Sequence, residues 1–149
     1  MATLGVPTRR MDRTWVNVLS TVPVLAGLSK RHIVRIAELA TERRVAAHSD
    51  IVRSGEIGDV FYVVLDGSVT VRRKGRKAVQ LGVGEFFGEI ALLNGGLRNA
   101  TVVADTDTLL MAIARKDFLK VLAAEPKVAM AMLVTVANRL RPLQSSPND

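Results

Sequence analysis

Apolar side chains recur at helical spacing near the start of the chain. Residues 11–19 predict a short helix, and Ser29 is a suitable N-cap for a second helix from Lys30 to about Thr41. Pro23 and Gly27 separate the two segments. The second segment carries an apolar stripe, with charged residues on its other face, so it predicts an amphipathic helix. The stripe consists of Ile33, Ile36, Ala37 and Ala40.

Between residues 44 and 114 the pattern changes from helical to β. Short valine-rich runs are separated by turn signals at Ser54-Gly55, Asp66-Gly67, Gly75 and Gly82. Many short strands at this spacing predict an antiparallel β fold, either closed or sandwiched. The expected strands cover residues 51–52, 60–65, 69–72, 78–81, 101–104 and 109–113.

The helical period returns from residue 115. Residues 115–123 predict one helix, and Pro126, which the first turn tolerates, begins another that ends near Pro142. The last helix has two adjacent apolar stripes, and this face is wider than a single contact needs. We therefore expect the helix to serve two surfaces, although both stripes could instead pack onto the rest of the domain. The stripes are Val128, Met132, Val136 and Leu140, and Ala129, Leu133 and Ala137.

Residues 86–101 place two opposite charges in apolar, glycine-rich surroundings. A charge in such sequence is costly unless it is paired or meets a ligand. Gly88 permits a close backbone approach, free N–H groups at a helix start bind anions, and Arg98 adds a forked, permanently charged donor. Glu89 can accept a hydrogen bond from a sugar hydroxyl. These features predict a site for a nucleotide with a compact phosphodiester.

The same residues resemble the phosphate-binding cassette of the cyclic nucleotide-binding domain family. The resemblance rests on Phe87-Gly88-Glu89-Ile90-Ala91-Leu92 and, after a short insert, Arg98-Asn99-Ala100-Thr101. It extends over about residues 25–140 and includes Ser54-Gly55-Glu56, residues 61–69 and Gly84-Glu85-Phe86. The family includes the catabolite activator protein, protein kinase A regulatory subunits and cyclic-nucleotide-gated channels. This chain departs from the family pattern at Leu97, where proline is frequent, and at Asn99, where a small residue or threonine is usual.

The resemblance implies a mainly β fold with flanking helices. The expected core is an eight-stranded antiparallel β-roll of jelly-roll type, with N-terminal helices and C-terminal lid helices. Residues 1–9 are short, mixed and expected to be disordered. Residues 10–149 are expected to form a single domain. Its parts are N-terminal helices in 10–42, the β-roll in 44–114 and C-terminal helices in 115–143.

The resemblance also implies a function and a site. The chain would be a non-catalytic sensor that binds cyclic AMP, and cyclic GMP more weakly, and relays occupancy through the C-terminal helix. Backbone N–H groups of Gly88, Ile90 and Ala91, with the Arg98 side chain, would hold the cyclic phosphate. Glu89 would hold the ribose 2′-hydroxyl. Other expected ligand contacts are Phe87, Asn99, Thr101, Val71 and Ala78.

The last helix has no aromatic residue after Leu119 that could stack on a base. The expected lid is therefore aliphatic, Leu140 or Leu143, with Arg139 or Arg141 nearby. The other side of this helix is expected to pair with a second copy of the chain or with another protein.

Composition removes several classes of function. The chain has 149 residues and no cysteine, which fits one domain without disulfides, thiol catalysis or cysteine metal sites. His32 and His48 lie on different expected elements, so no metal site is expected. No nucleophile elbow or phosphate-binding loop of the Walker type is present, so no enzymatic activity and no cofactor are expected. No apolar run approaches membrane-spanning length and no signal peptide is visible, so we expect a cytoplasmic protein.

Two alternative functions stay open, one of which rests on the net charge of +7. A basic chain can bind nucleic acid, but the densest cluster, residues 72–77, lacks interleaved aromatic residues and reads as a hairpin tip. A module of the same fold could also have lost its ligand and act through its last helix. The presence of both Glu89 and Arg98 argues against that alternative.

Overall fold

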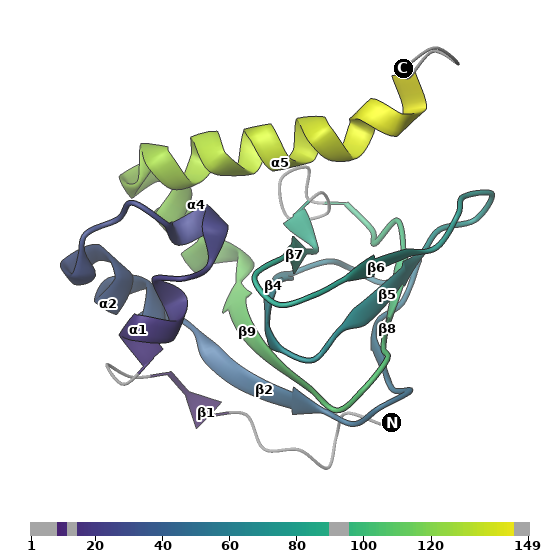
Figure 1. Cartoon of the computed structure of the whole chain (residues 1–149), viewed down its shortest axis with the longest axis horizontal. Helices are drawn as coiled ribbons and strands as arrows, with labels where there is room; N and C mark the ends of the chain where they lie inside the picture. The colour runs from purple at the N-terminus through teal and green to yellow at the C-terminus, as the bar shows by residue number, and fades with distance from the viewer. Residues whose placement is uncertain (1–8, 12–14, 90–95, 145–149) are drawn as a thin grey trace.

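The computed structural model describes residues 9–11, 15–89 and 96–144, without the side chains of residues 9, 10 and 140–144. Within these residues, helices gather at one end of a β-roll and the last helix runs across it (Figure 1). In chain order the elements are β1 (Arg9–Arg10), α1 (Val16–Leu19), the 3-10 helix η2 (Pro23–Leu25), α2 (Lys30–Leu39), β2 (Thr41–Val45), β3 (Asp50–Val52), β4 (Val60–Asp66), β5 (Val69–Arg72), β6 (Val79–Leu81), β7 (Phe86–Phe87), β8 (Thr101–Ala104), β9 (Thr108–Ala114), α4 (Arg115–Ala124) and α5 (Pro126–Gln144).

The strands form two antiparallel sheets. Their orders are β1-β2-β9-β4-β7 and β3-β8-β5-β6. Strands β2 to β9 make the eight-stranded β-roll, which confirms the predicted fold class. Strand β1 adds two residues at the edge of the first sheet, where Arg9 pairs with Glu42. Arg9, the last residue of the segment expected to be disordered, lies in this strand, while residues 1–8 lie outside the described part of the chain.

The N-terminal helices are shorter than predicted. Helix α1 covers only Val16–Leu19. Helix α2 has the predicted cap, because the Ser29 hydroxyl accepts a hydrogen bond from the His32 N–H, but it ends at Leu39 instead of near Thr41. Thr41 instead begins β2 and lies opposite Ala112 of β9. The β-roll thus begins three residues before the predicted boundary of 44, because pairing with a distant strand overrides the local helical pattern.

The C-terminal helices begin where the sequence predicts. Helix α4 starts at Arg115 and α5 at Pro126. Helix α5 does not end at Pro142, as predicted, but continues to Gln144. Pro142 lies in the last turn, so the lost N–H donor and the crowding by the proline ring affect only the end of the helix.

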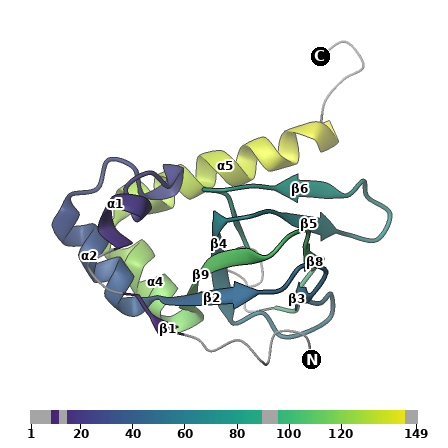
Figure 2. The same cartoon turned by 60° about the horizontal axis from the view of Figure 1, so that its bottom comes forward.

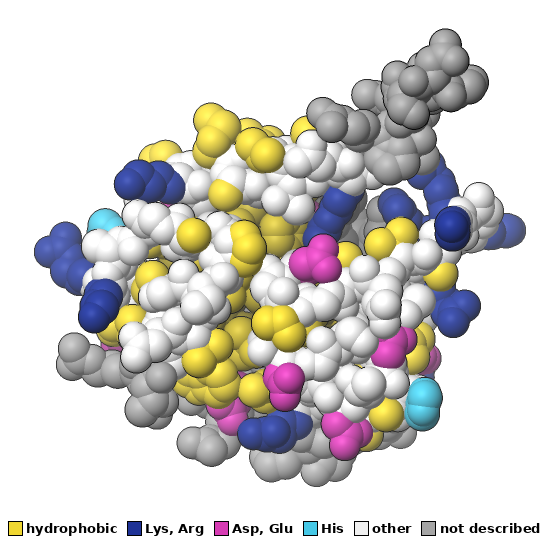
Figure 3. Space-filling view, viewed as in Figure 1, with side chains coloured by type: hydrophobic (Ala, Val, Ile, Leu, Met, Phe, Trp, Pro, Cys, Tyr) yellow, Lys and Arg dark blue, Asp and Glu magenta, His cyan; other side chains and the backbone are white. Residues whose placement is uncertain are grey.

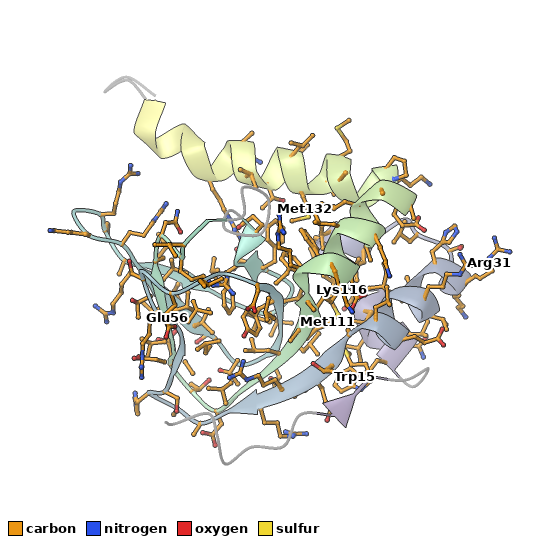
Figure 4. All side chains as sticks on the ribbon, turned by 180° about the vertical axis from the view of Figure 1, so that it is seen from behind. Trp15, Arg31, Glu56, Met111, Lys116 and Met132 are labelled. Atoms are coloured by element: carbon orange, nitrogen blue, oxygen red, sulfur yellow. The ribbon has the colours of Figure 1, made fainter. Side chains whose placement is uncertain are left out.

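Strand β4 divides its side chains between two apolar clusters. Phe61 and Val63 join a cluster that lies between the first sheet and the helices, whereas Tyr62 and Val64 face the interior of the β-roll. The division follows from the alternation of side chains along a strand. Figure 4 labels Met111 and Met132, which belong to the helix-side cluster, and Trp15, which packs against it.

Helix α5 has one buried and one exposed apolar face. Val128 and Met132 are buried against the helix-side cluster. On the opposite side, Met130, Leu133 and Val134 are between 55% and 63% exposed. Figure 3 shows apolar side chains along the outer edge of the molecule where α5 runs. The two predicted stripes therefore do not both pack onto the domain.

No helix in the described ranges combines the length and the apolar character that a membrane span requires.

Candidate ligand-binding site

A cavity of about 310 Å³ lies between the β-roll and α5. Residues from β3, β5, β6, β7 and β8 line it on one side, and Val136 and Arg139 of α5 line it on the other. Both cartoons show α5 passing over β6, with the cavity-forming strands beneath it (Figures 1 and 2). The volume is large enough for a small organic ligand.

Arg98 is a buried cation held by backbone carbonyls. Its side chain is only 7% exposed, and it donates to the carbonyl oxygen of Val60 at 2.7 Å and to that of Gly88 at 3.3 Å. A guanidinium has five N–H donors, so these two bonds fix its orientation without exhausting its donors. The site therefore presents an oriented positive charge at the cavity wall.

Burial and the neighbouring polar groups shift the pKa of Arg98 in opposite directions. Burial lowers the pKa of the Arg98 guanidinium, while the neighbouring Tyr62 and the carboxylates of Asp59, Glu56 and Glu89 raise it. The ordinary pKa of arginine lies so far above neutral that the group keeps its charge at neutral pH. A buried charge of this kind gains from an anionic ligand.

Gly88 allows the backbone to pass directly beside Arg98. Its φ is +92°, in the region that glycine favours. A Cβ at this position would lie 2.7 Å from Nη1 of Arg98 and 3.0 Å from the carbonyl oxygen of Val60. The close approach predicted for Gly88 is thus made to the arginine itself.

Glu89 is buried and paired with the last helix. It is 4% exposed, and its Oε1 lies 2.7 Å from Nη1 of Arg139. Arg139 also donates to the Phe86 carbonyl, and its guanidinium carbon lies 4.5 Å from the centroid of the Phe86 ring. One residue of α5 therefore connects this helix to both the carboxylate of Glu89 and strand β7.

The floor of the cavity is apolar and supported from behind. Phe87 lines the cavity, and Tyr62 stacks on it with ring centroids 5.0 Å apart and planes 18° apart. The Tyr62 hydroxyl accepts a hydrogen bond of 2.7 Å from Arg43. Burial raises the pKa of Tyr62, so the phenol is neutral at physiological pH. Val71 and Val79, paired across β5 and β6, supply a second apolar surface.

The structure brings most of the predicted site residues together at this cavity. The residues that line it are Val71, Phe87, Gly88, Glu89, Arg98 and Asn99. Ala78 is exposed and is not among the described lining residues, because Val79 takes the position opposite Val71. Thr101 is half-buried, and its hydroxyl accepts a hydrogen bond from the Ser54 N–H at 3.0 Å.

Other predicted contacts fall where the structure gives no account of them. Ile90 and Ala91 lie outside the described residues, as do the side chains of Leu140, Arg141 and Leu143.

Sequence reasoning missed Arg73, which lines the cavity from the end of β5. Strand alternation could have found it, because Val69, Val71 and Arg73 share one face. The pairing of Arg139 with Glu89 spans 50 residues, and no local pattern signals it.

Comparison with known proteins identifies the family of the chain. The sequence model of the family described as cyclic nucleotide-binding domain matches residues 42–125, more than half of the chain. The chain therefore belongs to the cyclic nucleotide-binding domain family, as its cassette residues predict.

The relatives include a potassium channel and a cyclic AMP receptor protein. The chain is 35% identical over 133 residues to a cyclic nucleotide-gated potassium channel of Rhizobium etli, covering 88% of this chain and 37% of the channel. It is 33% identical over 124 residues to the cyclic AMP receptor protein of Thermus thermophilus, covering 80% of this chain and 57% of that protein. The chain thus spans less than two thirds of either relative.

A solved structure supports the fold assignment. The structure of Sp-2Cl-cAMPS bound to PKAR CBD2 matches with a TM-score of 0.77, covering 90% of this chain and 92% of that one. At 22% identity this similarity shows the fold alone.

Proposed function

We propose that this chain is a sensor module without catalytic activity of its own, which binds cyclic AMP and, more weakly, cyclic GMP. The observation that carries the proposal is the buried Arg98, held at the cavity wall by two carbonyl oxygens. Carbonyl oxygens orient a guanidinium but carry no formal charge, so an anionic ligand would supply the compensating charge. Family membership favours a cyclic nucleotide as that anion.

In this proposal each part of the nucleotide has its own partner. The cyclic phosphate lies against Arg98 and the backbone N–H groups of Gly88, Ile90 and Ala91. The ribose 2′-hydroxyl donates to Glu89. The purine base lies between the apolar surface of Val71 and Val79 and the helix α5, whose Val136 lines the opposite side of the cavity. This arrangement places the negative charge at the buried cation and the flat base in the apolar part of the cavity.

Helix α5 is the element that would report occupancy. Arg139 holds Glu89 through the ion pair, and Glu89 is also the proposed partner of the ribose. A ligand that donates to Glu89 alters the interaction of this carboxylate with Arg139. Ligand binding would therefore shift the balance between positions of α5, since a ligand biases a two-state element only through a differential interaction.

The outer face of α5 would transmit this change to a second copy of the chain or to another protein. Its exposed residues Met130, Leu133 and Val134 are apolar neighbours at helical spacing. Sedimentation velocity with and without cyclic AMP tests self-association. Leu133→Glu should abolish any dimer, whereas Val83→Glu, at another exposed apolar position, should not.

A second candidate function rests on one observation. Glu89 already has a cationic partner in Arg139, so the fold satisfies this buried carboxylate without a nucleotide. A ligand-free interaction module that works through α5 would have the same feature. A basic nucleic-acid-binding role has only the net charge of +7 in its favour. Nucleotide titration separates both from the sensor.

The decisive experiment is calorimetric titration of the chain with cyclic AMP, cyclic GMP and 2′-deoxy cyclic AMP. We expect cyclic AMP to bind best, cyclic GMP within about tenfold of it, and the deoxy analogue more weakly than cyclic AMP. In Glu89→Gln the penalty for the missing hydroxyl should shrink, because a neutral acceptor has less to lose.

Arg98→Ala should weaken the binding of cyclic AMP about a hundredfold, because it removes a charge-assisted contact to the phosphate. Arg35→Ala on the exposed face of α2 removes the same charge away from the cavity and should leave the affinity unchanged. A wild-type chain that gives no heat with any of the three nucleotides would overturn the sensor. Equal affinities for Arg98→Ala and Arg35→Ala would overturn the assigned role of Arg98.

A further inference from the structure

Three arginines line the cavity, and they differ in whether their guanidinium groups have a partner among the described residues. Arg98 donates to two carbonyl oxygens, and Arg139 is paired with Glu89. Arg73 is half-buried and follows β5 on the face that Val71 presents to the cavity. Within the described residues, no hydrogen bond, ion pair or ring contact engages the Arg73 side chain. It is therefore the cavity-lining guanidinium for which the described residues provide no partner.

The immediate surroundings of Arg73 call for an acceptor on the ligand. Val71 and Val79, the nearest lining residues along β5 and β6, cannot accept a hydrogen bond. A guanidinium that is partly removed from water loses solvation unless an acceptor replaces it. Its planar fork is matched best by two acceptors side by side in one plane.

The two common purines differ in this respect. Guanine presents O6 and N7, which are adjacent acceptors and the commonest bidentate partner of arginine. Adenine presents N7 as an acceptor but a 6-amino group as a donor, so only half of the fork is satisfied. An unengaged arginine beside the apolar base surface thus favours a 6-oxopurine over a 6-aminopurine.

We propose that Arg73 determines base specificity by binding the O6 and N7 edge of a 6-oxopurine. Arg73 therefore adds to the affinity for cyclic GMP selectively, and this contribution keeps cyclic GMP within about tenfold of cyclic AMP. The inference rests on the proposed function, because it requires a cyclic nucleotide in this cavity.

The test is titration of wild type, Arg73→Ala and Arg73→Lys with cyclic AMP, cyclic GMP and cyclic IMP. Cyclic IMP carries O6 and N7 but lacks the 2-amino group of guanine. Arg73→Ala should weaken the binding of cyclic GMP and of cyclic IMP about tenfold, and the binding of cyclic AMP less than threefold. Arg73→Lys keeps the charge but loses the fork, so it should lose most of the same selectivity.

Arg76→Ala is the matched control. Arg76 is an exposed cation in the same hairpin, but it does not line the cavity. Equal weakening of all three nucleotides in Arg73→Ala and Arg76→Ala would mean that the hairpin acts only through its charge, and would overturn the proposal. Loss of cyclic GMP binding with cyclic IMP unaffected would place the selectivity at the 2-amino group, which a guanidinium without acceptors cannot bind, and would overturn the proposed contact with O6 and N7. If Arg73→Ala leaves the ratio of the cyclic GMP and cyclic AMP affinities unchanged, base recognition by Arg73 is refuted while the sensor function stands. A wild type that binds none of the three nucleotides would overturn the sensor function itself.

Discussion

Gly88 has no room for a side chain, because the Arg98 guanidinium lies directly beside its backbone. Gly88→Ala would place Cβ 2.7 Å from the Arg98 guanidinium at a φ of +92°. We expect nucleotide binding to be lost and the free energy of unfolding to fall by about 2 kcal/mol, because backbone strain and a displaced Arg98 add together.

The control for this substitution is Gly75→Ala. Gly75 has a φ of +73° in the β5–β6 hairpin, and nothing lies within 4 Å of an added Cβ. This variant should lose about 1 kcal/mol of stability and no affinity. Titration and thermal denaturation of both variants make the comparison. Similar behaviour of the two variants would mean that contact with Arg98 is unimportant.

The sequence predicted the charged residues of the candidate site better than its other parts. Glu89 and Arg98 stand out because charges in apolar, glycine-rich sequence need a partner, and both line the cavity. Arg73 was concealed within a run of five cations that reads as a solvated hairpin tip. Whether one member of such a run faces a cavity depends on where its strand ends, which composition does not determine.

At the scale of elements, Arg139 makes a polar contact between α5 and the β-roll. Arg139→Ala removes the ion pair to Glu89 and the hydrogen bond to the Phe86 carbonyl. We expect a loss of about 1–2 kcal/mol of stability, and faster amide hydrogen exchange in the second half of α5. Cyclic AMP should change exchange in α5 of wild type but not in this variant.

Lys127→Ala is the matched control, because Lys127 is an exposed cation at the start of the same helix. It should leave both the stability and the exchange response as in wild type. A ligand response of α5 that survives in Arg139→Ala would show that occupancy reaches the helix by another route.

A second element-scale feature is a carboxylate that joins three strands on the outer face of the second sheet. Asp105 follows β8 and accepts hydrogen bonds from Thr70 of β5 at 2.6 Å, Gln80 of β6 at 3.2 Å and Ser68 at 3.1 Å. These bonds, that from Thr70 foremost, lower the pKa of Asp105. They also hold in register the two strands that carry Val71 and Val79.

The lowered pKa makes a prediction about acid stability. The unfolded chain binds the Asp105 proton more readily than the folded chain does, so the contribution of Asp105 is fully present above its ordinary pKa of about 3.9. It is lost as the pH falls through the lower folded value. Asp105→Asn should reduce stability at neutral pH and flatten its dependence on pH below about 4. Urea midpoints measured from pH 7 to pH 2.5 check this, and parallel pH profiles for the two proteins would contradict it.

The sequence placed most elements well but missed three strands, the first of which is the two-residue β1 at the edge of the first sheet. All six predicted strands are present with ends within one residue. Strand β2 was missed because Glu42, Arg43 and Arg44 give it no apolar alternation, so its pairing with β9 decides its conformation. Strand β7 was missed because Phe86 and Phe87 are two residues inside the cassette, ordered by β4. Both depend on partners distant in sequence.

At the scale of the whole molecule, the net charge does not indicate where the candidate site lies. The chain carries +7, yet the cluster in residues 72–77 lies mainly at an exposed hairpin tip. Figure 3 shows dark-blue side chains gathered at the edge of the molecule where this hairpin projects. Composition therefore predicted a basic surface correctly, but it did not locate the two cavity cations, Arg98 and Arg139, that are held in the fold.

The division of β4 between two apolar clusters has a consequence for how the chain unfolds. Because β4 contributes side chains to both clusters, ordering β4 for one cluster also positions its side chains in the other. The domain should therefore unfold in one cooperative step. The chain carries its own two reporters, since Trp15, the single tryptophan, packs on the helix-side cluster and Tyr62, the single tyrosine, lies inside the β-roll. In urea, the tryptophan fluorescence and the ¹⁹F resonance of a fluorinated Tyr62 should give the same midpoint, and two separate midpoints would mean that the clusters melt independently.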